Sequence, residues 1–305
     1  MNEEILEKMD YCYSKLNERI NYALDHNDLD SIFKKLDEIN GPTLVTGVGG
    51  SSVVAAYVAK VMSAKKKDIF IYTTPRDLAH MDLSPYKNVI AVSYSGGNVG
   101  VTVSFENNLN KYLLSAKQRN NINNITYNCN PELSYLSVSA TLIPMAIMLL
   151  YYKNDRSLID EIIKETVKCD SNAEIYEVFM GIENKTASVA LESSFVEGGL
   201  APIILHDKYN YCHGRINLSE LKKSDAIYFK EDSELDSVLL NGLPKHFNKF
   251  ITIDRKYEDD IINEYYQTYI AYWLIYDVAK NKNKDVCHVI PPVDNDNYYL
   301  FKGKM

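Results

Sequence analysis

Two short turns rich in serine and glycine hold the residues whose chemistry is easiest to name. The first reads Gly47-Val48-Gly49-Gly50-Ser51-Ser52, and the second reads Ser93-Tyr94-Ser95-Gly96-Gly97-Asn98. Glycine lets backbone N–H groups approach an anion closely, and serine hydroxyls add further donors, so these turns predict a bound phosphate. The dinucleotide pattern G-x-G-x-x-G and the Walker pattern are both absent. Taken alone, either turn is also compatible with simple packing of a strand against a helix.

Each turn stands between a predicted buried strand and a predicted helix. The first lies between a strand at 44–47 and a helix at 52–62, and the second between a strand at 89–93 and a helix at 99–119. In an open parallel sheet the carboxyl ends of the strands face one crevice, so both turns can reach one ligand. We therefore expect a phosphate site at this edge, formed by Gly49, Ser51, Ser52, Ser93, Tyr94, Ser95 and Asn98.

Alternating strand and helix patterns continue along the chain and predict an α/β protein with two doubly wound, flavodoxin-like parallel-sheet halves. The predicted domains are N-terminal helices at 1–40, a first α/β domain at 41–155, a second at 156–292, and a tail at 293–305. Only the first half has Ser/Gly turns. The second has Gly181-Ile182-Glu183 and Lys230-Glu231-Asp232 in their place. Acidic side chains repel phosphate, so we expect the second half to supply something else.

The remaining predicted elements follow the same patterns. Helices are expected at 3–26, 28–39, 137–152, 158–169, 184–197, 233–241 and 261–280, and strands at 68–73, 123–128, 174–181, 202–206, 226–230 and 250–254.

Composition excludes several classes of function. The net charge of −8 argues against a nucleic-acid surface, which needs a basic patch. The longest apolar run, 140–152, is too short to span a bilayer, and no signal-peptide pattern is present, so a cytoplasmic location is expected. Five scattered cysteines without a C-x-x-C pair predict reduced thiols. No metal site or cofactor is expected, because His206 and Cys212-His213 have no second cluster to complete a site.

Motifs spread over nearly the whole chain resemble those of the two-domain sugar isomerase (SIS) family, which includes the isomerase half of glucosamine-6-phosphate synthase and related phosphosugar isomerases and deglycases. The two Ser/Gly turns are similar to the family's phosphate turns. Glu132, followed five residues later by Ser137, is similar to its E-x-x-x-x-S segment, whose serine lies at the sugar. Glu197, followed sixteen residues later by the dipeptide His213-Gly214, is similar to its catalytic pair.

The resemblance implies phosphosugar binding, a homodimer in which the His-Gly segment reaches the partner's pocket, and catalysis by two residues. Glu197 would be the base that moves a proton between adjacent carbons, and His213 would open the sugar ring. Each also has a structural alternative: Glu197 as a solvated helix end, with Glu192 as the rival base, and His213 as a structural histidine. Arg215, where many relatives have proline, could bind an anion or pair with an acid.

Departures from the family pattern leave two classes of function open. Asn98 replaces a threonine, Tyr94 replaces a glutamine, Ser194 replaces a lysine, and the C-terminal K-S-V-T segment is replaced by residues 284–288. Glutamine-dependent amination is not expected of this chain alone, because no amidotransferase domain precedes the first turn. One hypothesis is an aldose–ketose isomerase, or a related deaminase or deglycase, acting on a sugar or amino-sugar 6-phosphate. The other is a non-catalytic phosphosugar sensor that acts through a protein partner.

Overall fold

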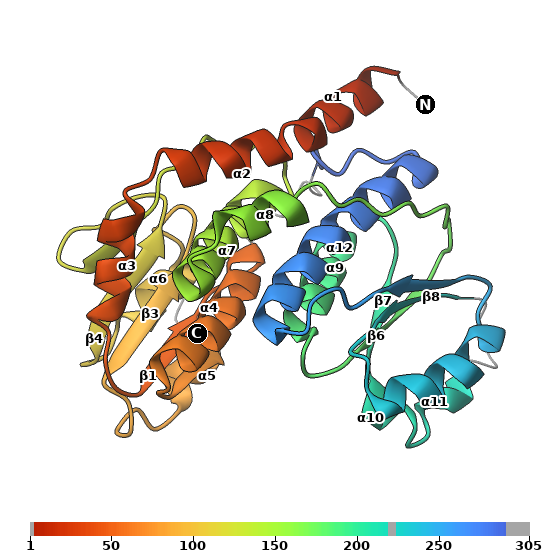
Figure 1. Cartoon of the computed structure of the whole chain (residues 1–305). Coiled ribbons are helices and arrows are strands. Elements are labelled where there is room, and N and C mark those ends of the chain that lie inside the picture. The colour runs from red at the N-terminus through yellow and green to blue at the C-terminus, as the bar shows by residue number, and fades with distance from the viewer. Residues whose placement is uncertain (1–2, 219–223, 291–305) are drawn as a thin grey trace. The chain divides into compact units, whose positions relative to one another are not determined.

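The computed structural model describes residues 3–218 and 224–290, which form two compact units (Figure 1). The first-sheet unit consists of Lys15–Arg156 together with residues 288–290. The second-sheet unit consists of residues 3–14 and Ser157–Cys287. In the part of the chain that the structure describes, no helix combines the length and apolar character needed to cross a membrane.

The first-sheet unit is built on a five-stranded parallel sheet in the order β2-β1-β3-β4-β5. The first strand lies between the second and the third, so the strand order reverses between β1 and β3. Its strands are β1 (Thr43–Thr46), β2 (Phe70–Thr73), β3 (Asn88–Val92), β4 (Asn110–Ser115) and β5 (Asn123–Thr126).

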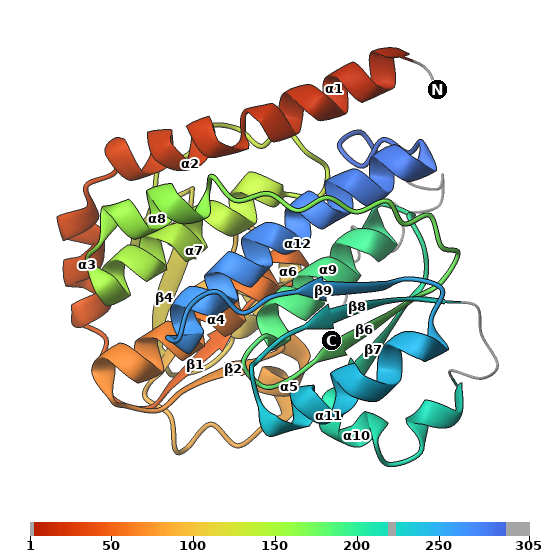
Figure 2. The ribbon, with the colours of Figure 1, turned by 45° about the vertical axis from the view of Figure 1, so that its right-hand side comes forward.

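Helices cover both faces of this sheet (Figure 2). On one face α4 (Gly50–Lys66) packs against α7 (Val138–Lys153), and α2 (Leu16–Asp25) lies against α7. α3 (Leu29–Asp37) contacts β5. The opposite face packs against α5 (Pro75–His80) and α6 (Val99–Ser104). Apolar side chains of the strands and of these two helices form its core: Leu44, Leu78, Val89, Ala91, Val101 and Leu113.

The second-sheet unit holds a four-stranded parallel sheet in the order β7-β6-β8-β9. Its first strand again lies between its second and its third. Its strands are β6 (Tyr176–Met180), β7 (Ile203–Asp207), β8 (Asp225–Phe229) and β9 (Phe250–Ile253). On one face α9 (Lys185–Glu197) packs along α12 (Asp260–Lys282).

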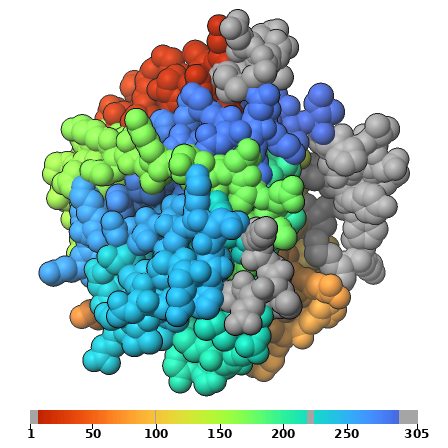
Figure 3. Space-filling view, turned by 90° about the vertical axis from the view of Figure 1, so that its right-hand side faces the viewer, coloured from red at the N-terminus to blue at the C-terminus, as the bar shows by residue number. Residues whose placement is uncertain are grey.

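The other face of the second sheet packs against α10 (Lys208–Tyr211), α11 (Glu234–Gly242) and the 3₁₀ turn at Leu243–His246. Its core contains Phe179, Tyr211, Tyr228, Leu239 and Leu243. The surface of these elements is coloured teal to light blue in Figure 3. Helix α1 (Glu3–Ser14) also belongs to this unit, because the Tyr13 ring lies 4.7 Å from the ring of Tyr276 in α12.

Most predicted elements are confirmed, but the helix expected at 99–119 is wrong. Those residues form the short helix α6, a turn, and strand β4. The Asn107 side chain closes that turn: its amide donates to the Ser104 carbonyl, and its oxygen accepts from the Leu109 N–H at 3.0 Å. Because asparagine favours turns over helix interiors, the pair Asn107-Asn108 was the local signal for the break.

Other helices also differ from the sequence-based expectations. The helix expected at 3–26 is divided at Lys15 into α1 and α2, which belong to different compact units. The helix expected at 158–169 is the shorter α8 (Arg156–Ile162), and α5 and α10 are short helices that the sequence patterns missed. The predicted tail at 293–305 lies outside the described residues.

Candidate functional site

The two Ser/Gly turns lie at the same edge of the first sheet, where its strand order reverses. β1 and β3 are parallel neighbours, and Thr46 at the end of β1 pairs with Ala91 in β3. Val48 of the first turn also packs against the start of α6, the helix that follows the second turn, since a Cβ added to Gly100 would lie 2.4 Å from the Val48 side chain. In open α/β sheets, ligands bind at such a reversal point.

Glycine is required in the first turn for two different reasons. Gly49 has φ +59° and ψ −136°, a conformation that residues with a side chain rarely adopt. At Gly47 a Cβ would lie 2.4 Å from the Ser51 carbonyl oxygen, so the backbone there is closely packed. The turn leads directly into α4, whose first residue is Gly50. This is the arrangement that brings backbone N–H groups close to an anion.

The two serines of the first turn are half-buried and differ in their contacts. The Ser52 hydroxyl donates to the Gly49 carbonyl at 2.7 Å and also contacts the hydroxyl of Tyr72, at the end of β2. Burial raises the pKa of Tyr72, against the effect of this contact with Ser52. The N–H of Ser51 donates to the Val48 carbonyl at 3.2 Å. Ser52 therefore braces the turn.

In the second turn, Ser93 is an internal brace and Ser95 is exposed. Ser93 is only 1% exposed, and its hydroxyl accepts the Gly96 N–H at 3.1 Å and the Asn98 amide at 3.5 Å. The Asn98 side-chain oxygen accepts the Val101 N–H at 2.9 Å and so caps α6. Asparagine and threonine both serve as helix N-caps, so Asn98 can fill a capping role that a threonine would otherwise have.

Ser137 and Tyr94 bring a third loop to this edge of the sheet. Ser137 precedes α7, and its Cβ lies 4.0 Å from the point where a Cβ on Gly50 would stand. The Tyr94 hydroxyl accepts the Glu132 N–H at 3.3 Å, so the second turn is tied to the loop that follows β5. Burial raises the pKa of Tyr94, and the nearby Cys129 acts in the same direction. The structure therefore brings all eight predicted binding residues to one edge of one unit.

Sequence reasoning missed Arg19, a buried residue of α2 that supports this third loop. Arg19 is 8% exposed and donates to the carbonyls of Asn130 and Pro131 and to the Ser139 hydroxyl. The signal was its place on the apolar stripe of α2, among Leu16, Ile20 and Ala23. An arginine is rarely buried unless its charge has partners.

The predicted catalytic residues both lie in the second-sheet unit, at opposite edges of its sheet. Glu197 is the last residue of α9, which runs back to the edge where β7 begins, whereas His213 follows the end of β7. A five-residue strand spans roughly 15 Å. One chain therefore does not bring Glu197 and His213 together.

The surroundings of the two predicted catalytic residues are open. Both side chains are exposed. The Glu197 carboxylate accepts the Ser193 hydroxyl at 3.1 Å. Neighbouring protein raises the pKa of the Glu197 carboxyl by desolvation, Glu192 acts in the same direction, and the Ser193 hydrogen bond opposes both. Solvent screens this effect because the side chain is exposed. The His213 ring lies 5.3 Å from the ring of Tyr209.

At the carboxyl edge of the second sheet, the turn after β6 holds one of the protein's own carboxylates. Glu231 accepts the Glu183 N–H at 2.9 Å, and its carboxylate lies against Gly181, where any Cβ would overlap it. The buried Lys208 ammonium lies 3.2 Å from Glu231 and 2.7 Å from Asp236. An external phosphate would have to displace Glu231 from this turn.

The described residues contain no group of three potential metal ligands. His206, considered above as a ligand, is buried with its Nε2 atom 2.8 Å from a Glu177 carboxylate oxygen. His206 is therefore paired with a carboxylate inside the core of the second-sheet unit.

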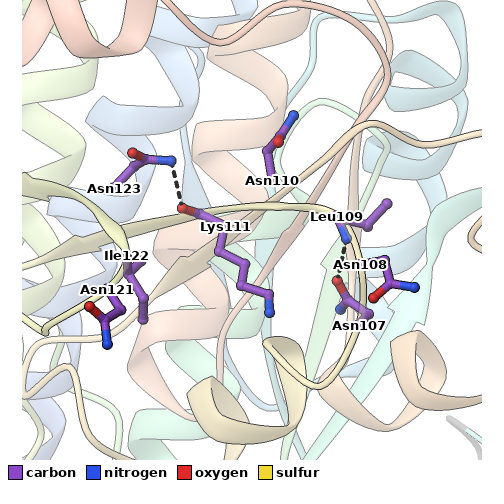
Figure 4. Close-up of a pocket in the computed structure, with 8 residues that line it drawn as sticks. All are labelled: Asn107, Asn108, Leu109, Asn110, Lys111, Asn121, Ile122 and Asn123. Atoms are coloured by element: carbon purple, nitrogen blue, oxygen red, sulfur yellow. Dashed lines mark hydrogen bonds between the residues drawn. The ribbon is translucent and has the colours of Figure 1, made fainter.

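An open hollow lies at the opposite edge of the first sheet, at the start of β4 and β5 (Figure 4). Several of its asparagines close local structure: Asn107 bonds to Leu109, and the Asn123 amide donates to the Lys111 carbonyl at 3.2 Å. It shares no residue with the Ser/Gly turns. The hollow is lined by Asn107, Asn108, Leu109, Asn110, Lys111, Asn121, Ile122 and Asn123.

Solved structures share this fold at low sequence identity. The C-terminal domain of glucosamine-fructose-6-phosphate aminotransferase from Francisella tularensis matches with a TM-score of 0.68 and 13% identity, over 95% of this chain and 99% of that one. Tagatose-6-phosphate ketose/aldose isomerase from Escherichia coli also gives 0.68 and 13%, over 94% and 96%. Glucosamine-6-phosphate deaminase from Thermotoga maritima gives 0.64 and 14%, over 88% and 94%.

No family model and no curated protein matches the chain. At 13–14% identity, the likeness to the solved structures establishes the fold alone, an α/β protein with parallel sheets. These neighbours include enzymes named for phosphosugars, and that agrees with the resemblance found in the sequence motifs.

Proposed function

We propose that this protein binds a sugar or amino-sugar 6-phosphate at the carboxyl edge of the first sheet and acts on it as an aldose–ketose isomerase or a related deaminase or deglycase. The observation that carries the proposal is the meeting of two Ser/Gly turns and Ser137 where the strand order reverses. Backbone N–H groups and the hydroxyls of Ser51 and Ser95 would hold the phosphate. That remote binding energy would orient the sugar.

The proposed chemistry moves a proton between two adjacent carbons. Glu197 would take and return the proton, and His213 would assist ring opening. Because the two residues lie at opposite edges of one sheet, the proposal requires that one of them come from a second copy of the chain, and the family resemblance assigns that role to His213. A homodimer with shared sites meets this requirement, and twofold dimers are the commonest oligomers.

A thermal-shift screen of hexose and pentose phosphates, followed by NMR of each stabilising compound in deuterated water, tests the proposal. We expect at least one sugar phosphate to raise the melting temperature and to exchange the hydrogen next to its carbonyl with solvent. If no sugar phosphate stabilises the protein, the phosphosugar proposal fails.

A phosphosugar sensor is the second candidate. The position three residues before Glu197, where the family resemblance calls for lysine, is occupied by the buried Ser194, which cannot supply an ammonium group. Binding without any exchange of the carbon-bound hydrogen would favour the sensor. The screen above thus separates the two candidates.

A further inference from the structure

Ser137 lies at the start of α7 but does not act as its cap. A serine in this position normally accepts an N–H of the first helical turn through its hydroxyl. Ser137 instead has φ +54° and ψ +38°, in the left-handed region, and makes no such bond. Residues other than glycine hold this conformation only where the surroundings impose it, and such strain is concentrated at functional sites.

Glu132, five residues earlier, takes over the capping of α7. One carboxylate oxygen accepts the N–H groups of Leu133 and Ser134 at 2.9 and 3.1 Å. The other accepts the Ser139 hydroxyl at 2.8 Å and the Ala140 N–H at 2.7 Å. The carboxylate thus grips the chain on both sides of Ser137, and the Ser137 hydroxyl has no capping role.

Arg19, in helix α2, binds the same loop. Its guanidinium donates to two consecutive carbonyls, those of Asn130 and Pro131, and its Nε donates to the Ser139 hydroxyl at 3.1 Å. Ser139 is therefore shared between Arg19 and Glu132. A planar guanidinium can make these bonds together, whereas a lysine ammonium cannot match their geometry.

We propose that Glu132 and Arg19 are positioning residues that hold Ser137 in its left-handed conformation, so that its hydroxyl faces the sugar of a phosphosugar whose phosphate lies on the two Ser/Gly turns. The proposal rests on the function proposed above. The place of Ser137 at the sugar is what the sequence resemblance implies, and its positioning by Glu132 and Arg19 is what the structure adds. The proximity of Ser137 to Gly50 brings this loop beside the first Ser/Gly turn.

Binding of two probes, inorganic phosphate and glucosamine 6-phosphate, tests the proposal by calorimetry on the full chain. In Glu132→Gln one carboxylate oxygen becomes an NH₂ group, which would face N–H and O–H donors of the loop instead of accepting from them. We expect Glu132→Gln and Ser137→Ala each to weaken glucosamine 6-phosphate binding by about tenfold and to leave phosphate affinity within about twofold. The combined variant should bind glucosamine 6-phosphate no more weakly than the weaker-binding single variant, because both substitutions remove the same contact between Ser137 and the sugar.

Arg19→Lys provides a second variant should Glu132→Gln fail to fold, and we expect the same selective loss from it. Asp28→Ala is the matched control. It removes a carboxylate cap from α3 in the same unit, where Asp28 accepts the Ser31 N–H at 3.1 Å. We expect this control to lower the melting temperature without changing the ratio of the two affinities.

The outcomes separate this proposal from the proposed function. Equal weakening of both probes in Glu132→Gln and Arg19→Lys, or multiplied losses in the combined variant, would overturn the positioning role. A silent Ser137→Ala in a protein that binds both probes would overturn it as well, while leaving phosphosugar binding intact. A wild type that binds neither probe nor any sugar phosphate of the thermal-shift screen overturns both proposals.

Discussion

At the scale of single residues, the proposed chemistry depends on the Glu197 carboxylate. Glu197→Gln keeps the size and removes the basic oxygen, so turnover should fall by about 10²- to 10⁴-fold while phosphosugar affinity stays nearly unchanged. Because the pKa of Glu197 is raised, the base is lost as pH falls through that raised value, and activity should decline on the acid side. Kinetics from pH 4 to 8 measure both effects, with Glu192→Gln as the comparison. Full activity in Glu197→Gln would exclude it as the base.

The two serines of the second turn should respond differently to truncation. Ser95 is exposed at the proposed phosphate, so Ser95→Ala should weaken phosphate binding by about ten- to a hundredfold, the usual effect of losing a hydrogen bond to a charged group. Ser93 braces the turn, so Ser93→Ala should also lower the melting temperature. Ser84, exposed between α5 and β3, is a control. Unchanged phosphate affinity in the double variant Ser93→Ala/Ser95→Ala would locate the phosphate elsewhere.

At the scale of elements, the β1–α4 turn depends on the backbone conformation of Gly49. A Cβ there has room, since no atom lies within 4 Å of it, but φ +59° with ψ −136° is unfavourable for alanine. Gly49→Ala should therefore cost about 1–3 kcal/mol in the free energy of unfolding. Gly97→Ala is the matched control, because Gly97 has no positive φ and its nearest neighbour would be 3.9 Å away. Equal losses measured by urea unfolding would contradict this reading.

The network that joins α10, β8 and α11 in the second-sheet unit should make stability depend on pH. Burial alone would raise the pKa of Asp236, but hydrogen bonds from Lys208, Tyr228 and the Glu231 N–H outweigh burial and lower it. A carboxyl with a lowered pKa stabilises the fold above its unfolded-state pKa, about 4, and the effect is lost as pH falls through the folded value. The melting temperature should therefore drop below pH 4, and Asp236→Asn should remove much of this dependence. An unaltered pH profile in the variant would exclude Asp236 as its source.

At the scale of the whole molecule, the proposed homodimer predicts complementation between inactive variants. Glu197→Gln and His213→Asn chains, each nearly inactive alone, form mixed dimers in which one of two shared sites is intact. After unfolding and refolding together, about a quarter of wild-type activity should return, because half of randomly paired dimers are mixed. Light scattering should show a dimer at micromolar concentration. A monomer that retains sugar-phosphate binding would contradict the shared site.

The sequence by itself determined the local features: the buried strands, the Ser/Gly turns after β1 and β3, and the alternation that produces parallel sheets. These features depend on residues that are near one another in the chain. Examples are the period at which apolar residues recur and the backbone conformations that glycine can adopt. Where local signals conflicted, the sequence misled. Residues 110–115 have a helical pattern in isolation but become β4, because pairing with β3 and β5 decides their conformation.

Only the tertiary structure decided how distant residues share one site. Arg19 and Glu132 are more than one hundred positions apart, and their common contact with Ser139 follows from the packing of α2 against α7. The separation of Glu197 from His213 is likewise a matter of topology, since a helix and the strand after it run in opposite directions. Sequence spacing fixes distance along the chain, whereas catalysis and binding depend on distance in space, which the layering of helices on a sheet determines.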